Sequence, residues 1–142
     1  MRDIKRNVGE VSEEIADYWE IPQHKKKIIF ETMKLYNHVL PHKEQFINDD
    51  SFYKALDSVE EIIAEPDYVF YDEIKQGLEY YKLLDEYVML VVQTIDKREL
   101  PVASIYPVTQ TKINNRKLRE EKMKQEKIIE KYMYRDEEPI NV

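Results

Sequence analysis

The sequence lacks several residues and motifs on which common sites depend. It has no cysteine, which excludes disulfides and thiolate metal sites. Its two glycines form no phosphate-binding loop, nucleophile elbow or Rossmann fingerprint, so the commonest nucleotide-binding and hydrolase motifs are absent. No apolar run approaches the roughly 18 residues of a membrane helix, and the charged N-terminus lacks a signal-peptide core. These absences predict a soluble, cytoplasmic protein.

What is present is typical of a folded domain. The chain has 142 residues, of which 42% are hydrophobic, and eleven are tyrosines, a composition too apolar and aromatic for a disordered segment. We predict one domain over residues 1–133 and an acidic tail over residues 134–142.

The charge is unevenly distributed. The net charge of −7 includes +4 in residues 111–127 and +3 in Lys25, Lys26 and Lys27, so the remainder carries −14. An acidic chain is a poor general ligand for nucleic acid, since phosphate contact needs clustered cations. The basic run at Lys26 and Lys27 is either a solvated edge or an RNA contact.

Helical patterns dominate residues 11–64. Ser12 is an expected N-cap for a helix that stops before Pro22, and Thr32 for a second helix that Pro41 kinks or ends. Asp50 or Ser51 is expected to cap a third helix, which reaches about Ala64. A final helix is expected from about Gln110 to Tyr132.

Strand patterns occupy residues 67–107. Four aromatic or β-branched runs are joined by short connections, which predicts an antiparallel meander. A shorter strand is expected at residues 26–31. The fold class is therefore α+β, with N-terminal helices packed on an antiparallel sheet of about four strands and closed by a long C-terminal helix over residues 110–133. The four runs are residues 67–71, 78–84, 87–95 and 100–106.

The junction Val102–Arg116 concentrates polar chemistry. It predicts an apolar strand, a break at Pro107 and a basic first turn of the last helix. Lys112, Asn115 and Arg116 lie where backbone N–H groups are unsatisfied, which is suited to anion binding. Tyr106 ends the strand beside this turn, and Ser104 precedes it.

Two histidines stand four residues apart at His38 and His42. In a continuous helix they would share a face. Three interpretations are open: a general acid/base pair, a pair of metal ligands, or two polar surface residues. The spacing alone does not distinguish between them.

Several segments together resemble the phage-associated members of the barnase, EndoU, colicin and RelE-like nuclease group. The resemblance covers about residues 25–120. It implies a metal-independent endoribonuclease without a cofactor, often toxin-like and carried by phages or other mobile elements. The segments are Asn37–His38, Pro41–Glu44, IIAEPDYV (Ile62–Val69), DEYVMLVV (Asp85–Val92) and VASIYPVTQTKINNR (Val102–Arg116).

The resemblance also implies roles for individual residues. By position, His38 and His42 match the histidine pair, and Ser104, Tyr106 and Lys112 match the polar residues of the strand-to-helix junction. One histidine would take the 2′-OH proton, and the other histidine or Tyr106 would protonate the leaving oxygen. Lys112 and Arg116 would hold the phosphate charge. Further RNA contacts are expected from Ser104, Asn115, Arg116, Lys26 and Lys27.

The expected partners are an RNA substrate in a bacterial host and an antitoxin or host protein, with no membrane. The alternative function is a non-catalytic, phage-encoded module that binds a host protein or RNA, which suits the acidic bulk of the chain. The nuclease hypothesis requires the first helical layer to lie over the edge of the last strand.

Overall fold

The computed structural model describes residues 2–95 and 98–133. The expected acidic tail at residues 134–142 and part of the expected turn at 96–99 lie outside the described residues. The chain divides into two compact units, which meet in the sequence between Thr109 and Gln110. Each unit is described by itself, and a single domain over residues 1–133 stays a prediction.

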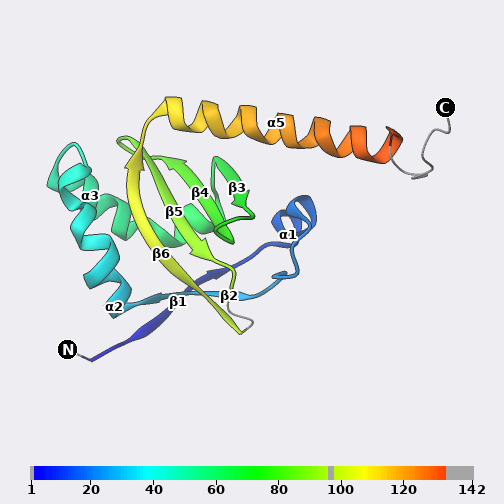
Figure 1. Cartoon of the computed structure of the whole chain (residues 1–142). Coiled ribbons are helices and arrows are strands. Elements are labelled where there is room, and N and C mark those ends of the chain that lie inside the picture. Colours follow the sequence, from blue (N-terminus) through cyan, green and yellow to red (C-terminus); the bar gives the residue numbers. More distant parts are fainter. Residues whose placement is uncertain (1, 96–97, 134–142) are drawn as a thin grey trace, which may run out of the picture. The chain divides into compact units, whose positions relative to one another are not determined.

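The first unit contains a six-stranded sheet in the order β1-β2-β6-β5-β4-β3 (Figure 1). The four strands β3 to β6 form the predicted antiparallel meander. Along the chain the elements are β1 (Lys5–Glu10), α1 (Glu13–Trp19), β2 (Lys27–Glu31), α2 (Thr32–Lys34), η1 (Leu35–Val39), η2 (Leu40–Gln45), α3 (Asp49–Asp57), α4 (Val59–Ala64), β3 (Tyr68–Asp72), β4 (Gly77–Leu83), β5 (Tyr87–Gln93) and β6 (Glu99–Val108).

The prediction of N-terminal helices packed on an antiparallel sheet of about four strands is corrected by β1 and β2, which extend the sheet to six strands. β2 forms where a strand was expected, but it joins the same sheet and pairs with β6 in parallel at Lys27–Ile29. β1 pairs with β2 in antiparallel orientation. The sheet is therefore mixed. The sequence of β1, KRNVGE, shows no alternation of apolar and polar residues, and Val8 is the single buried side chain of this strand.

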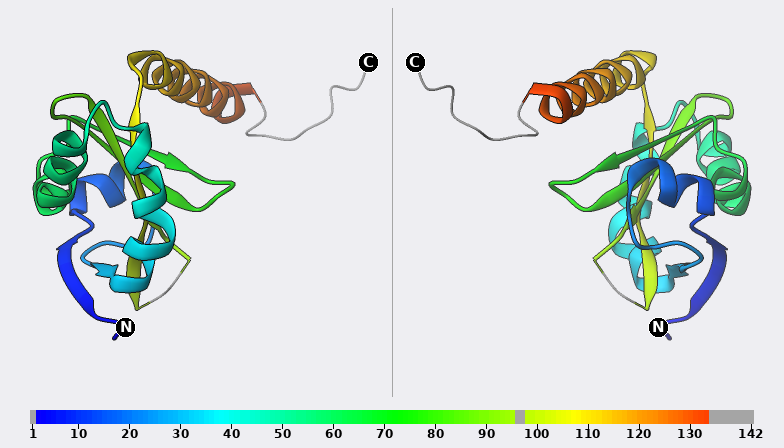
Figure 2. Two further views of the ribbon diagram at one scale, coloured as in Figure 1. Left: turned by 90° about the vertical axis from the view of Figure 1, so that its left-hand side faces the viewer. Right: turned by 90° about the vertical axis from the view of Figure 1, so that its right-hand side faces the viewer.

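The strands present two different faces. Pairing residues point to the same side of a sheet, and the side alternates along each strand. An irregularity at Ala103, between the pairs Val91–Ser104 and Val92–Val102, shifts this alternation in β6. The first face, here called the core face, packs with α3 and α4 (Figure 2). Its members include Leu78, Tyr80, Val88, Leu90, Val92, Val102 and Ile105.

The opposite face, here called the second face, carries a mixture of aromatic and polar side chains. Glu79 pairs with Val91, which pairs with Ser104, and Tyr81 pairs with Met89, which pairs with Tyr106. Registers of this kind place all six side chains on one side. The second face thus brings a carboxylate, two phenols and a hydroxyl onto three neighbouring strands.

The observed helix ends agree with one of the N-caps predicted from the sequence and differ from the others. Ser12 caps α1 as predicted, because its side chain accepts a hydrogen bond from the Ile15 N–H. Thr32 is not a cap but the first residue of α2, and its hydroxyl bonds the main chain of Ile4 instead. Asn48, rather than Asp50 or Ser51, caps α3. The helix expected up to Ala64 is divided at Ser58 into α3 and α4.

The second unit consists, in its described part, of α5 (Gln110–Met133), which confirms the predicted last helix. Gln110 Nε2 donates to Asn114 Oδ1 at 3.0 Å, and Lys124 forms an i, i+4 ion pair with Glu120 at 3.2 Å. Among the helices of the described residues, none combines the length and apolar character that crossing a membrane requires.

Candidate active site

The first helical layer lies against the last strand. β2 pairs with β6 only as far as Pro101, and beyond that point η1 and η2 contact β6. A hydrogen bond joins the two segments, from Ser104 Oγ to the main-chain oxygen of His38 at 3.3 Å. The arrangement that the nuclease hypothesis required is therefore present in the first unit.

The helical segment changes type at Leu40, beside Pro41, in agreement with the prediction that this proline kinks or ends the helix. Residues 35–39 form a π-helix and residues 40–45 a 3-10 helix, with Pro41 at the start of the second. A proline cannot donate the hydrogen bond that continues an α-helix, so the change of helix type occurs where it stands. The continuous α-helix that would give His38 and His42 a common face is not formed.

The predicted break at Pro107 is wrong, because β6 continues to Val108. Pro107 pairs with Val88 of β5. A proline has no N–H to donate, so within a sheet it is tolerated where its nitrogen faces the edge of a strand. The outer edge of β6 at this end is not occupied by β2. Tyr106 consequently stands within a strand and not at a break.

His42 and Tyr106 are in contact. Their ring centroids are 5.2 Å apart with an interplanar angle of 38°. His42 Nδ1 is buried and has no hydrogen-bond partner among the described residues. His38 differs, since its side chain is exposed while its main chain is fixed by Ser104. His38 therefore contacts β6 at Ser104 and His42 contacts it at Tyr106. These two positions of the strand are about 7 Å apart along an extended chain.

Tyr106 has a second group of neighbours on the second face. Burial raises the pKa of the Tyr106 phenol, and the charge of Glu79 raises it further. The Tyr81 hydroxyl donates to Glu79 Oε1 at 2.8 Å. We name His42, Tyr106, Glu79 and Tyr81 the second-face cluster.

Sequence reasoning missed two members of this cluster, Glu79 and Tyr81. The strand was among the four predicted runs, but its sequence GLEYYKL does not alternate cleanly between apolar and polar residues. The available signal was a single carboxylate between Leu78 and Tyr80 in an otherwise apolar stretch of the predicted strand, where a charge is costly without partners.

The other predicted site residues belong to other elements. Lys27 is the first residue of β2 and directly follows Lys26. Lys27 pairs with Glu99, the first residue of β6. Seven residues of strand, about 23 Å, separate Glu99 from Tyr106, so the structure does not bring these lysines to the cluster. Lys112, Asn115 and Arg116 lie in the first turns of α5, in the second unit.

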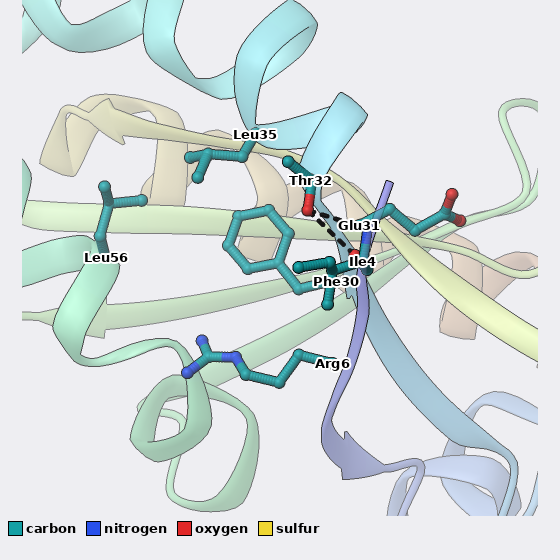
Figure 3. Close-up of a pocket in the computed structure, with 7 residues that line it drawn as sticks. All are labelled: Ile4, Arg6, Phe30, Glu31, Thr32, Leu35 and Leu56. Atoms are coloured by element: carbon teal, nitrogen blue, oxygen red, sulfur yellow. Dashed lines mark hydrogen bonds between the residues drawn. The ribbon is translucent and has the colours of Figure 1, made fainter. Parts of the chain in front are cut away.

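Two cavities of the first unit lie away from the cluster. The first, of about 260 Å³, is drawn in Figure 3 between β1, β2, α2 and α3. Its walls are largely apolar, and Thr32 closes one side through its bonds to Ile4. Neither cavity is lined by a predicted site residue. The linings are Ile4, Arg6, Phe30, Glu31, Thr32, Leu35 and Leu56 for the first, and Gly9, Glu10, Ser12, Glu14, Ile15, Ile63, Ala64, Glu65, Pro66 and Val69 for the second, of about 630 Å³.

The comparisons with known proteins identify the class. Residues 6–115 match the model of the family described as phage-Barnase-EndoU-ColicinE5/D-RelE like nuclease3. The chain belongs to this family of phage-associated nucleases. Comparison with curated proteins gave no match, and comparison with solved structures gave none either.

Proposed function

We propose that the protein is a toxin-type endoribonuclease of a phage or mobile element, which cleaves RNA in the bacterial cytoplasm without a metal ion. The observation that carries this proposal is the ring contact between His42 and Tyr106, in a chain of a nuclease family. An imidazole changes its protonation state near neutral pH, and a phenol donates hydrogen bonds, so the pair suits phosphate chemistry.

In the proposed reaction the ribose 2′-OH loses its proton to one of the two histidines while its oxygen attacks the phosphorus. The bond from phosphorus to the 5′-oxygen breaks, and the other histidine or Tyr106 gives that oxygen a proton. The products are a 2′,3′-cyclic phosphate and a 5′-hydroxyl. Each acid or base typically contributes about 10²- to 10⁴-fold. Ser104 supports His38 by fixing its main chain at 3.3 Å.

The proposed phosphate-binding residues are cations of α5, and this part of the proposal comes from the sequence. We propose that Lys112 and Arg116 bind the phosphate of the substrate and that Asn115 contacts RNA, as expected for the basic first turns of this helix. Lys26 and Lys27 are proposed to bind the RNA backbone at a distance from the cleaved bond. An antitoxin or host protein remains the proposed physiological partner.

The test is incubation of the purified protein with RNA in EDTA. We expect cleavage that leaves 2′,3′-cyclic phosphate ends, and no cleavage at a position where the RNA carries a single 2′-deoxy sugar. Lys112→Ala should reduce the rate, and Lys131→Ala, which removes a lysine near the other end of α5, serves as the matched control. Absence of cleavage, or cleavage that survives the 2′-deoxy substitution, contradicts the proposal.

A second candidate function is a binding module for a basic host protein. The cavity of about 630 Å³ favours it, because the carboxylates of Glu10, Glu14 and Glu65 surround apolar walls that include Ile15 and Ile63. Acidic surfaces of this kind attract basic partners. A pull-down from host lysate with and without ribonuclease distinguishes the two functions. A partner that survives ribonuclease treatment and is lost with Glu14→Lys, together with no RNA cleavage, supports the binding module.

A further inference from the structure

The end of the second face beside the β4–β5 hairpin carries apolar side chains that are not fully covered. Towards the middle of the sheet, Phe70 and Tyr81 are buried. At the hairpin end, Leu83 is 53% exposed, and Tyr68 and Tyr87 are partly exposed. A tyrosine ring that stays partly in water has apolar surface left for a ligand. This end of the face is therefore accessible for binding.

The strand register places the two partly exposed tyrosines beside each other. Tyr68 of β3 pairs with Tyr81 of β4, and Tyr87 of β5 pairs with Leu83 of β4. Because pairing residues point to the same side of a sheet, both rings stand on the second face, on the two strands that flank β4. Their centroids are 6.5 Å apart, with an interplanar angle of 46°. We name Tyr68 and Tyr87 the tyrosine pair.

The tyrosine pair lies close to the candidate active site. Tyr87 pairs with Val108 of β6, and Met89 pairs with Tyr106. The levels of Tyr87 and Tyr106 are thus two residues apart, about 7 Å along an extended strand. The His42 ring is 5.2 Å from the Tyr106 ring. A nucleotide whose phosphate lies at His42 and Tyr106 can therefore place an adjoining base over the tyrosine pair.

The charges at this end of the sheet favour a base over a phosphate as the bound group. The turn after Leu83 contains Asp85 and Glu86, and the nearby cation Lys54 is engaged by Asp85 at 2.9 Å. Phosphates bind where cations are clustered, so this acidic turn offers them little. An aromatic ring instead binds a nucleobase by stacking, which needs no cation and accepts every base.

We propose that Tyr68 and Tyr87 form a base-stacking subsite, which holds the base of a nucleotide next to the cleaved phosphate. This assignment rests on the proposed ribonuclease function, and it adds the class of substrate. A base inside a duplex is already stacked between its neighbours, so the subsite selects unpaired RNA. Because every base has a π-face, it selects little between base types.

Three variants separate stacking from other effects. Tyr87→Leu removes the ring and keeps an apolar side chain. Tyr87→Phe keeps the ring and removes the hydroxyl, so it should behave as the wild type if the ring stacks. Tyr132→Leu is the matched control, because Tyr132 is a 60% exposed tyrosine on α5, about 24 Å of helix beyond Arg116.

The first measurement is binding, followed by fluorescence anisotropy with a short single-stranded 2′-O-methyl oligonucleotide that cannot be cleaved at its 2′ positions. The reference is an abasic strand of the same length and charge. The wild type should bind the strand with bases more tightly by about ten-fold or more, and Tyr87→Leu should lose most of this preference. Tyr87→Phe and Tyr132→Leu should keep it.

The same preference should persist at raised salt, because stacking, unlike phosphate contact, releases no counterions. Equal affinity of the wild-type protein for the two strands, or no binding of either, overturns the inference without reference to any variant. A preference that Tyr87→Leu retains in full also overturns it.

The second measurement is the kinetics of RNA cleavage. A single abasic nucleotide directly beside the cleaved bond should raise KM of the wild type by about ten-fold, and one further along the strand should not. In Tyr87→Leu the adjacent abasic nucleotide should have little further effect. Cleavage with an unchanged KM in Tyr87→Leu contradicts the subsite alone. A wild type that cleaves no RNA contradicts the proposed function, and the binding measurement then decides on stacking.

Discussion

The two faces of the sheet use the same strands for different purposes. On the core face, Tyr80, Leu90 and Ile105 are fully buried against the helices. On the second face, Glu79 and Tyr106 stand in the same strands one residue away, beside His42 of η2. One residue of register therefore separates a largely aliphatic face from a face that carries polar and ionisable groups, which is the consequence of the period-two alternation of a strand. Tyr81 and Met89 of the second face are also buried.

The largest expected difference between the faces is in stability. Leu90→Ala removes a fully buried side chain from the core, and should lower the free energy of unfolding by about 2–5 kcal/mol. Val91→Ala, at the next position, affects a half-buried side chain and should cost less. Urea denaturation of both variants measures the two changes. An equal or larger loss for Val91→Ala contradicts the assignment of the core face.

A smaller contrast is expected between the adjacent tyrosines. The Tyr80 hydroxyl is buried without a partner among the described residues, so Tyr80→Phe should be neutral or stabilising. Tyr81→Phe removes a donor from buried Glu79, and should lower the free energy of unfolding by about 1–3 kcal/mol. Thermal unfolding of the pair checks this order. If Tyr80→Phe is the more destabilising variant, the hydrogen-bonding account of the second face is wrong.

The smallest expected effect concerns the hydrogen bonds between α3, which packs on the core face, and the carboxylate of Asp85. These bonds depend on pH. Hydrogen bonds from Lys54 and Ser51, both at 2.9 Å, hold the pKa of Asp85 below its ordinary value, with the Lys54 bond as the larger cause. A lowered folded-state pKa stabilises the protein above the ordinary value of 3.8, and this contribution is lost as the pH falls through the folded value.

Asp85→Asn should therefore be less stable than the wild type at neutral pH, and the difference should shrink below about pH 4. Unfolding temperatures measured from neutral to acid pH follow this convergence. A difference that stays constant across the range means that the Asp85 hydrogen bonds do not depend on its charge.

The meander and the last helix were predictable because their signals are local. The runs at β3 to β6 are apolar and aromatic between polar turns, and α5 has no internal breaker. β1 was not predictable, since KRNVGE buries one residue and becomes a strand only by pairing with β2. The division between α3 and α4 falls at Ser58. The Ser58 hydroxyl donates a hydrogen bond to the Lys54 carbonyl at 2.7 Å, a local bond that competes with regular helix.

The candidate site was predictable in part. His42 and Tyr106 could be named from the sequence as chemical groups, but their contact depends on the parallel pairing of β2 with β6, which brings the following helical segment to that strand. Such pairing is set by tertiary structure. The irregularity at Ala103 also had no sequence signal that we identified, although it turns Ser104 and Tyr106 to the second face.

The most direct test of the central claim is RNA cleavage in EDTA by His42→Ala, with His24→Ala as the matched control. His24 is an exposed histidine paired with Glu13 at 3.9 Å, away from the second-face cluster. We predict that His42→Ala loses about 10²- to 10⁴-fold in cleavage rate at unchanged stability, and that His24→Ala cleaves as the wild type does. Equal cleavage by the two variants would contradict the assignment of chemistry to the second face.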